Sequence, residues 1–188
     1  MARSKEFDRD EALKAAINVF REHGFEGTST EMLIKSMKVG RQSLYDTFGD
    51  KWQLYRSAVE QYLNSEAAAH IDTLVSEMRA IDGIRAIVWR VVDEANRPCL
   101  GVSSICEFGQ TRPDLIAVHQ AADRRLKEAM KRRIAEAEAD GDLTDQVSSP
   151  EIADFMIANF SGIRIAARGG ADQKHLQSLG TMALRAIS

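Results

Sequence analysis

The chain has 188 residues, of which 44% are hydrophobic and 28% are charged, so it can bury a core and is not intrinsically disordered. Its 25 basic and 28 acidic side chains give a net charge of -3, which as an average argues against a polybasic nucleic-acid coat or a membrane-surface protein. Its two cysteines cannot form a disulfide framework, and no Cys-x-x-Cys pair indicates a zinc site, so we expect no metal and no other cofactor.

The N-terminal residues MARSKEF lead directly into further charged residues without an apolar stretch, so no signal peptide is expected. No run approaches the roughly 18 consecutive apolar residues of a transmembrane helix. Together these features predict a cytoplasmic protein with no membrane partner.

Apolar residues recur at helical spacing from the start of the chain. Asp8, with Glu11 three residues later, is typical of a helix start, and His23-Gly24 is typical of a helix end. The apolar stripe between them consists of Leu13, Ala16, Ile17 and Phe20. This pattern predicts the first helix.

Two short helices joined by a tight turn are predicted next. Thr28 or Ser29 can cap the first of them, whose apolar face is formed by Met32, Leu33 and Met37. The turn falls on residues 38–40, and the second helix covers 41–47 with Leu44 and Phe48 as core residues. This arrangement is a helix-turn-helix, whose second helix enters the major groove of DNA.

The second of these helices begins with side chains suited to DNA. Arg41 can contact a phosphate or a guanine edge, and Gln42 can pair with adenine. Ser43 and Tyr45 can donate hydrogen bonds to phosphates. Ordinary amphipathic packing, with Tyr45 in the core, is the alternative, and the motif context favours DNA binding.

Asp50, followed by Gln53, predicts the start of a long helix with Leu54, Ala58 and Tyr62 on its apolar face. Further helices are predicted over residues 83–96, 103–110, 114–139, 150–167 and 172–187. Prolines, which break helix interiors, are confined to positions 98, 113 and 150. No stretch alternates with the period of a half-buried strand, so the predicted fold class is all-α.

At this point the sequence resembles the TetR-type transcriptional regulators. The matching residues are Ala16, Phe20, Gly24, Phe25, Thr28, Ser29, Val39, Ser43, Leu44, Tyr45, Phe48, Lys51 and Leu54. The resemblance implies an N-terminal three-helix DNA-binding head with a helix-turn-helix in residues 1–56, and a C-terminal helical bundle for ligand binding and dimerisation in residues 57–188. The DNA contacts that it implies fall on Thr28, Thr30, Lys38, Gly40, Arg41, Gln42, Ser43, Tyr45, Thr47 and Lys51.

Three residues depart from the pattern of this family, the first being Gly40, where serine is common. Lys38 stands in the turn where the family usually has glycine, and a left-handed backbone there costs about 1 kcal/mol relative to glycine. Gln42 stands where glycine is common, and its side chain on the groove-facing side can help to select the operator. The N-terminal Arg3 and Lys5 fit either an arm that contacts DNA or a solubilising tail.

The charge is unevenly distributed. Residues 1–56 hold ten basic and nine acidic side chains, and residues 57–188 hold fifteen and nineteen. Since a single helix-turn-helix makes few contacts, we expect a homodimer. The resemblance favours an interface on the last two helices, although their apolar stripes more commonly indicate an intramolecular core. The predicted interface residues are Ile152, Phe155, Met156, Asn159, Phe160, Ile163, Leu176, Leu179, Met182 and Ala183.

The resemblance also implies an effector pocket in residues 57–140. Its candidate lining residues are Trp89, Cys99, Cys106, Phe108 and His119. The alternative for Trp89 and Phe108 is a place in the core, and for His119 a hydrogen-bonded or surface position. The cysteines fit small buried hydrophobes or a thiol sensor, and their separation, about 10 Å along a helix, is too large for a disulfide.

The leading interpretation is a DNA-binding transcriptional regulator, a repressor that an unknown small-molecule effector releases from a palindromic operator. No phosphate-binding loop, nucleophile elbow or metal-ligand cluster indicates an enzyme. The alternatives are a thiol- or electrophile-responsive regulator and a helical interaction module without DNA binding. The basic run in residues 124–133 precedes an acidic stretch and is interpreted as a solvated helix face.

Overall fold

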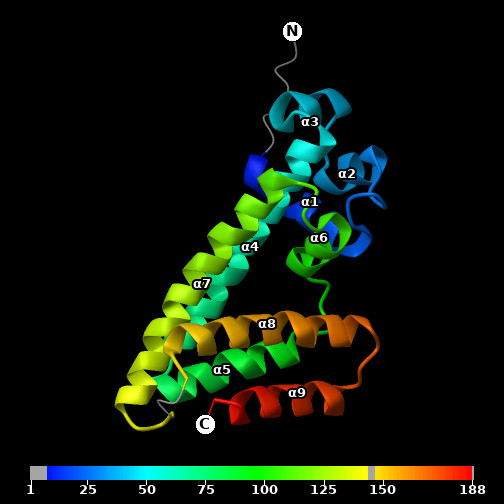
Figure 1. The fold of residues 1–188 in the computed structure, drawn as a ribbon. Coiled ribbons are helices and arrows are strands. Elements are labelled where there is room, and N and C mark those ends of the chain that lie inside the picture. The colour runs from blue at the N-terminus through cyan, green and yellow to red at the C-terminus, as the bar shows by residue number, and fades with distance from the viewer. Residues whose placement is uncertain (1–7, 144–146, 188) are drawn as a thin grey trace. The chain divides into compact units, whose positions relative to one another are not determined.

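The computed structural model describes residues 8–143 and 147–187, so that Arg3 and Lys5 lie outside the described residues. Every regular element in these residues is a helix, which confirms the predicted all-α fold (Figure 1). The elements are α1 (Arg9–His23), α2 (Thr30–Met37), α3 (Arg41–Phe48), α4 (Lys51–Val75), α5 (Ala80–Asp93), α6 (Leu100–Phe108), α7 (Pro113–Ala139), α8 (Ser149–Arg168) and α9 (Gln173–Arg185). Among the described residues, no helix is long and apolar enough to cross a membrane.

The chain forms two compact units. The first comprises residues 1–63 and 99–119, and the second comprises residues 64–98 and 120–188. α4 and α7 each contribute residues to both units. The first unit therefore holds α6 in addition to the three N-terminal helices, and the functional division at residue 56 stays a prediction.

One face of each of the three N-terminal helices contributes to the core of the first unit. α1 contributes Phe20, α2 contributes Leu33 and α3 contributes Leu44, and all three side chains are almost fully buried. Leu54 and Tyr55 of α4 complete this core with no exposed surface. Burial of apolar surface on α4 therefore holds the short helices in place.

Side-chain caps fix where these helices begin. Asp8 Oδ1 accepts from the Asp10 and Glu11 amides at 2.9 and 3.2 Å, and Ser29 Oγ accepts from the Met32 amide at 3.2 Å. Asp50 Oδ1 accepts from the Gln53 amide at 2.8 Å. These caps confirm the helix starts predicted at Asp8 and Asp50. Of the two predicted candidates, Thr28 and Ser29, it is Ser29 that caps α2.

Two helices begin three residues before the predicted position. α6 starts at Leu100 because the Cys99 thiol caps it, accepting from the Val102 amide at 3.5 Å. α5 starts at Ala80, which places Gly83 inside the helix. A Cβ at Gly83 would lie 2.1 Å from the Leu74 carbonyl oxygen, so this glycine permits close approach to α4 and does not start the helix.

In the second unit, α5, α8 and α9 lie side by side (Figure 1), and the later residues of α4 and α7 complete the bundle. Its core is aliphatic, with Ile84, Ile87, Met130, Ile134 and Met156 fully buried. The N-terminus of α8 carries a capping box between Ser148 and Glu151, which satisfies backbone amides that the helix leaves unpaired.

Lys38 ends α2 in the left-handed conformation, with φ 56° and ψ 38°. Within the described residues it is the one non-glycine residue with a positive φ. We expect Lys38→Gly to raise the free energy of unfolding by up to about 1 kcal/mol, because glycine adopts this conformation without the Cβ penalty. Thermal denaturation measures the change.

Lys35→Gly is the matched control, because Lys35 is an exposed lysine inside the same helix. There glycine should lower the stability by about 1 kcal/mol. A lower melting temperature for Lys38→Gly than for the wild type would contradict the account of the turn.

Candidate DNA-binding surface

The two helices of the predicted motif expose one polar face. Leu33, Met37, Val39, Leu44 and Phe48 are buried, which confirms Leu44 and Phe48 as core residues. The predicted contact residues with exposed side chains or backbone are Lys38, Gly40, Arg41, Gln42 and Thr47, and those partly buried are Thr30, Ser43, Tyr45 and Lys51. The structure thus brings nine of the ten predicted residues to accessible positions on α2, the turn, α3 and the start of α4.

Thr28 is the exception, and its predicted role in contacting DNA is corrected. Its side chain is 1% exposed, and its hydroxyl donates to the Gly24 carbonyl oxygen at 2.6 Å. The threonine hydroxyl therefore closes the turn between α1 and α2 from inside. Sequence spacing could not separate this role from a surface role, because Thr28 adjoins the true cap, Ser29.

Hydrogen bonds join the polar side chains across this face. The Thr30 and Tyr45 hydroxyls lie 3.3 Å apart and connect α2 to α3. Gln42 Nε2 donates to Asp46 Oδ1 at 2.8 Å, one turn further along α3. The Arg41 guanidinium pairs with the Glu31 carboxylate of α2. Both partners of this ion pair are largely exposed, so it contributes little to stability.

An aromatic cluster positions Lys51, the predicted phosphate contact. The Phe25 ring meets Trp52, Tyr55 and Phe108 edge-on, with centroids 5.1 to 5.6 Å apart. Lys51 Nζ lies 4.3 Å from the centroid of the Phe25 ring, within the range of a cation–π contact. The Trp52 indole donates to Asp114 Oδ2 at 2.9 Å, which fixes the ring beside Lys51.

The five predicted effector residues lie in different places. Cys99, Cys106, Phe108 and His119 belong to the first unit and Trp89 to the second. Phe108 joins the aromatic cluster, and His119 Nε2 lies 2.8 Å from the buried Ser104 hydroxyl. Cys106 is exposed and Cys99 is partly buried. Trp89 is 36% exposed.

An apolar cavity of about 240 Å³ occurs elsewhere in the second unit. Its lining residues come from the start of α8, the end of α9 and the segments beside them, and are Val147, Glu151, Ile152, Phe155, Ala186 and Ile187. These residues include none of the predicted effector contacts. No group of three or more His, Cys, Asp and Glu side chains in the described part of the chain could hold a metal ion.

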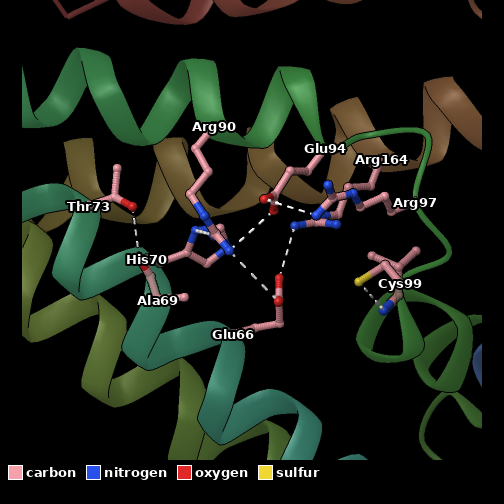
Figure 2. Close-up of polar contacts among 10 residues, drawn as sticks. Glu66, Ala69, His70, Thr73, Arg90, Glu94, Arg97, Cys99 and Arg164 are labelled. Atoms are coloured by element: carbon pink, nitrogen blue, oxygen red, sulfur yellow. Dashed lines mark hydrogen bonds and ion pairs between the residues drawn. The ribbon is translucent and has the colours of Figure 1, made fainter. Parts of the chain in front are cut away.

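The second unit also holds a partly buried polar network that sequence reasoning missed (Figure 2). Arg90 of α5 donates from Nη1 to His70 Nδ1 of α4 at 2.6 Å and pairs with Glu94 at 3.2 Å. Arg164 of α8 donates to Glu66 of α4 at 3.3 Å. The contacts tie three helices together. Arg90 and Glu94 have the i,i+4 spacing of a helical ion pair, but the contacts between helices join residues 20 and 98 positions apart, which no spacing rule groups.

His70 is neutral in this network. The Arg90 guanidinium can only donate a hydrogen bond, so His70 Nδ1 must accept it and carries no proton. Burial, followed by the charges of Arg90 and Arg164, lowers the pKa of His70 to about 3. The Phe160 ring stacks on the imidazole at a centroid distance of 6.0 Å. The neutral ring therefore fits between an aromatic face and two cations.

Most of the predicted dimer residues are buried in the chain's own core, which corrects their assignment. Ile152, Met156, Phe160, Ile163, Leu176 and Ala183 are at most 5% exposed. Phe155 and Met182 are exposed, and Asn159 and Leu179 are partly buried. A helical apolar stripe has the same period whether it faces a core or a partner, so the sequence could not distinguish the two.

Known proteins resemble this chain over almost its whole length. The family model described as bacterial regulatory proteins, tetR family, matches residues 12–58. The uncharacterized HTH-type transcriptional regulator YezE of Bacillus subtilis is 31% identical over 94% of both chains. The HTH-type transcriptional repressor ComR of Escherichia coli is 23% identical over 97% of this chain and 90% of its own.

Solved structures share the fold. A cysteine mutant of the TetR family regulator CifR, complexed with 26 bp operator DNA, is 29% identical, covers both chains completely and has a TM-score of 0.77. The fold and the exposed polar face thus define a helix-turn-helix transcriptional regulator. The chain belongs to the tetR family of bacterial regulatory proteins.

The buried histidine makes stability depend on pH. Because the pKa of His70 is lower in the folded chain, about 3, than its ordinary value of 6.5, the unfolded chain binds more protons between these two pH values. This contribution to stability is complete above pH 6.5 and is lost as the pH falls. We expect a loss of about 2 kcal/mol between pH 7 and pH 5 from this group, measured by urea denaturation.

His70→Gln should reduce this loss, and His175→Gln should leave it unchanged, because His175 is exposed on α9. The comparison is between the slopes of unfolding free energy against pH for the wild type and the two variants. A variant that is less stable at every pH has the same slope, so a general loss of stability does not affect the test. Equal slopes for the wild type and His70→Gln would show that His70 is not held neutral by the fold.

Proposed function

We propose that this chain is a transcriptional repressor that binds a palindromic operator as a homodimer and leaves it when a small-molecule effector binds. The observation that carries the proposal is the exposed polar face of α3, with Arg41, Gln42 and Thr47 opposite the buried Leu44 and Phe48. The full-length similarity to CifR, whose structure contains operator DNA, supports it. Such a protein works in the cytoplasm and needs no catalytic group.

The mechanism assigns α3 to the major groove. Arg41 and Gln42 stand at its N-terminal end, where a recognition helix contacts base edges. Arg41 is already paired with Glu31 in the free chain, so a phosphate or base must replace that carboxylate when DNA binds. Tyr45 and Lys51, held by Thr30 and Phe25, contact the backbone and fix the register of the helix.

The last two helices supply the proposed dimer contact through their exposed residues. Phe155, Ala158, Gly162 and Ile165 are exposed at helical spacing on α8, and Met182 is 55% exposed on α9. The small residues Ala158 and Gly162 permit close approach of a second helix. Two heads held together can read two half-sites, which compensates for the few cations on each head.

Release by an effector requires a ligand that binds the DNA-incompetent arrangement more tightly than the competent one. We assign DNA binding to residues 1–56 and both effector binding and dimerisation to residues 57–188. Trp89, Cys99, Cys106 and His119 stay candidates for the effector site, and Phe108 is a weaker one because its ring is engaged in the aromatic cluster.

The DNA-binding proposal is tested on a duplex that the wild-type protein enriches from a random-sequence library. Arg41→Ala and Tyr45→Ala should each weaken binding by about tenfold or more, with the fold retained in circular dichroism. Binding by the wild type should weaken steeply as salt rises, because phosphate contacts release counterions. Sedimentation of the complex should give two chains per duplex.

Arg132→Ala is the matched control, because Arg132 is exposed in the basic run of α7. We expect it to leave the affinity nearly unchanged. Other basic residues of that run are engaged within the fold, as when Lys127 pairs with Asp154 and Arg133 donates to the Glu77 carbonyl oxygen. Full affinity in both the Arg41 and the Tyr45 variants would overturn the proposed surface.

A second candidate function is a regulator whose effector is an electrophile. The observation in its favour is that both cysteines lie at the ends of one short helix, with Cys99 at the N-terminus of α6 and Cys106 exposed two residues before its end. The structure of CifR with operator DNA is that of a cysteine mutant. A soft electrophile would form a carbon–sulfur bond at Cys106.

N-ethylmaleimide tests this candidate. The cysteine sulfur adds to its carbon–carbon double bond, and no group leaves. Treatment should release the wild type from its selected duplex and should not release Cys106→Ser. Cys99→Ser should respond as the wild type does, because its remaining thiol is the exposed one. Release of Cys106→Ser would show that Cys106 does not carry the response. Release of the double variant Cys99→Ser/Cys106→Ser would show that neither thiol carries it, and the first proposal then stands alone.

A further inference from the structure

Residues far apart in the sequence meet at the turn between α1 and α2. Glu107 of α6 accepts two hydrogen bonds from consecutive backbone amides of this turn. Its Oε2 accepts from the Phe25 amide at 3.0 Å and its Oε1 from the Glu26 amide at 2.8 Å. Both carboxylate oxygens are therefore engaged, although Glu107 is an exposed residue and the two hydrogen bonds lie at the surface. Bonds to a carboxylate are stronger than those between neutral groups.

The backbone conformation of the turn at Gly24 allows the Glu107 carboxylate to approach closely. Gly24 has φ 69°, which favours glycine, and a Cβ there would lie 3.1 Å from Glu107 Oε2. Successive amides beside such a residue form a concave site for an anion, and here the anion is a side chain of the same unit. We call these two hydrogen bonds the Glu107 contact.

The Glu107 contact lies next to the residues that face DNA in the proposed function. The Thr28 amide donates to the Phe25 carbonyl oxygen at 3.2 Å, and the Thr28 hydroxyl donates to Gly24. Ser29, the cap of α2, follows directly. On the other side, the Phe25 ring carries Lys51 on its face. The turn that Glu107 contacts therefore leads to the start of α2 and carries the ring that Lys51 contacts.

We propose that Glu107 is a positioning residue for DNA binding, through which α6 sets the start of the helix-turn-helix. This inference rests on the proposed function and deepens it, because it names the contact that a shift of α6 would break. Such a shift, whether from a ligand or from a group added at the neighbouring Cys106, withdraws the carboxylate from the turn. The turn then loses two fixed amides, and α2 and Lys51 lose their register for DNA.

Glu107→Gln tests the inference, because the side chain keeps its size and loses one of its two acceptors. We expect amide hydrogen exchange at Phe25 and Glu26 to become faster by about tenfold, with a circular dichroism spectrum like that of the wild type. Affinity for the selected duplex should fall by about tenfold, and affinity for a scrambled duplex should not fall. Partial unfolding would weaken both.

Glu60→Gln is the matched control, because Glu60 is an exposed glutamate of α4 in the same unit. Removing one negative charge should by itself strengthen DNA binding slightly, so weaker binding by Glu107→Gln runs against the general charge effect. Glu107→Asp, which keeps the carboxylate on a shorter chain, should recover part of the affinity.

The outcomes separate this inference from the proposed function. If the wild type enriches no duplex, the proposed function fails and the inference fails with it. If the wild type binds and Glu107→Gln binds equally well or better, the proposed function stands and Glu107 does not position the head. Unchanged exchange at Phe25 and Glu26 would also overturn the inference, whatever the affinity.

Discussion

Two helices of eight residues each cannot hold their geometry in water, since isolated helices shorter than about 12 residues are marginal. α2 and α3 have this length, so the proposed DNA-binding surface depends on packing against α1 and α4. Leu33, Leu44 and Phe48 face that core, and this requirement determines which side chains remain for solvent. The exposed face of α3 is therefore a consequence of where its apolar residues must go.

The Glu107 contact adds a polar constraint to this apolar one. Burial fixes the faces of the helices, but not the register of the turn that leads into α2. In the second unit, the network of Glu66, His70, Arg90 and Arg164 has a similar arrangement, with three charged groups and a neutral imidazole joining helices that an aliphatic core has already brought together. We expect such partly buried pairs to contribute less to net stability than to a defined arrangement of the helices.

The sequence was sufficient where the signal is local. Caps at Asp8 and Asp50, the left-handed position at Lys38 and the apolar face of α3 all depend on neighbours within a turn or two. It failed where the partner is distant: Gly83 serves contact with Leu74 and does not start a helix, and Glu107 acts on amides more than 80 residues away. The buried faces of α8 and α9 show the remaining limit, because periodicity reports an apolar face and not what covers it.

In the proposed function α3 faces DNA, and hydroxyl-radical footprinting of the side chains tests this most directly. Tyr45 is partly buried but accessible in the free chain, and Met78, between α4 and α5, is 99% exposed. Adding the selected duplex should slow the oxidation of Tyr45 severalfold and leave that of Met78 unchanged. Binding of the duplex without any protection of Tyr45 would contradict the account.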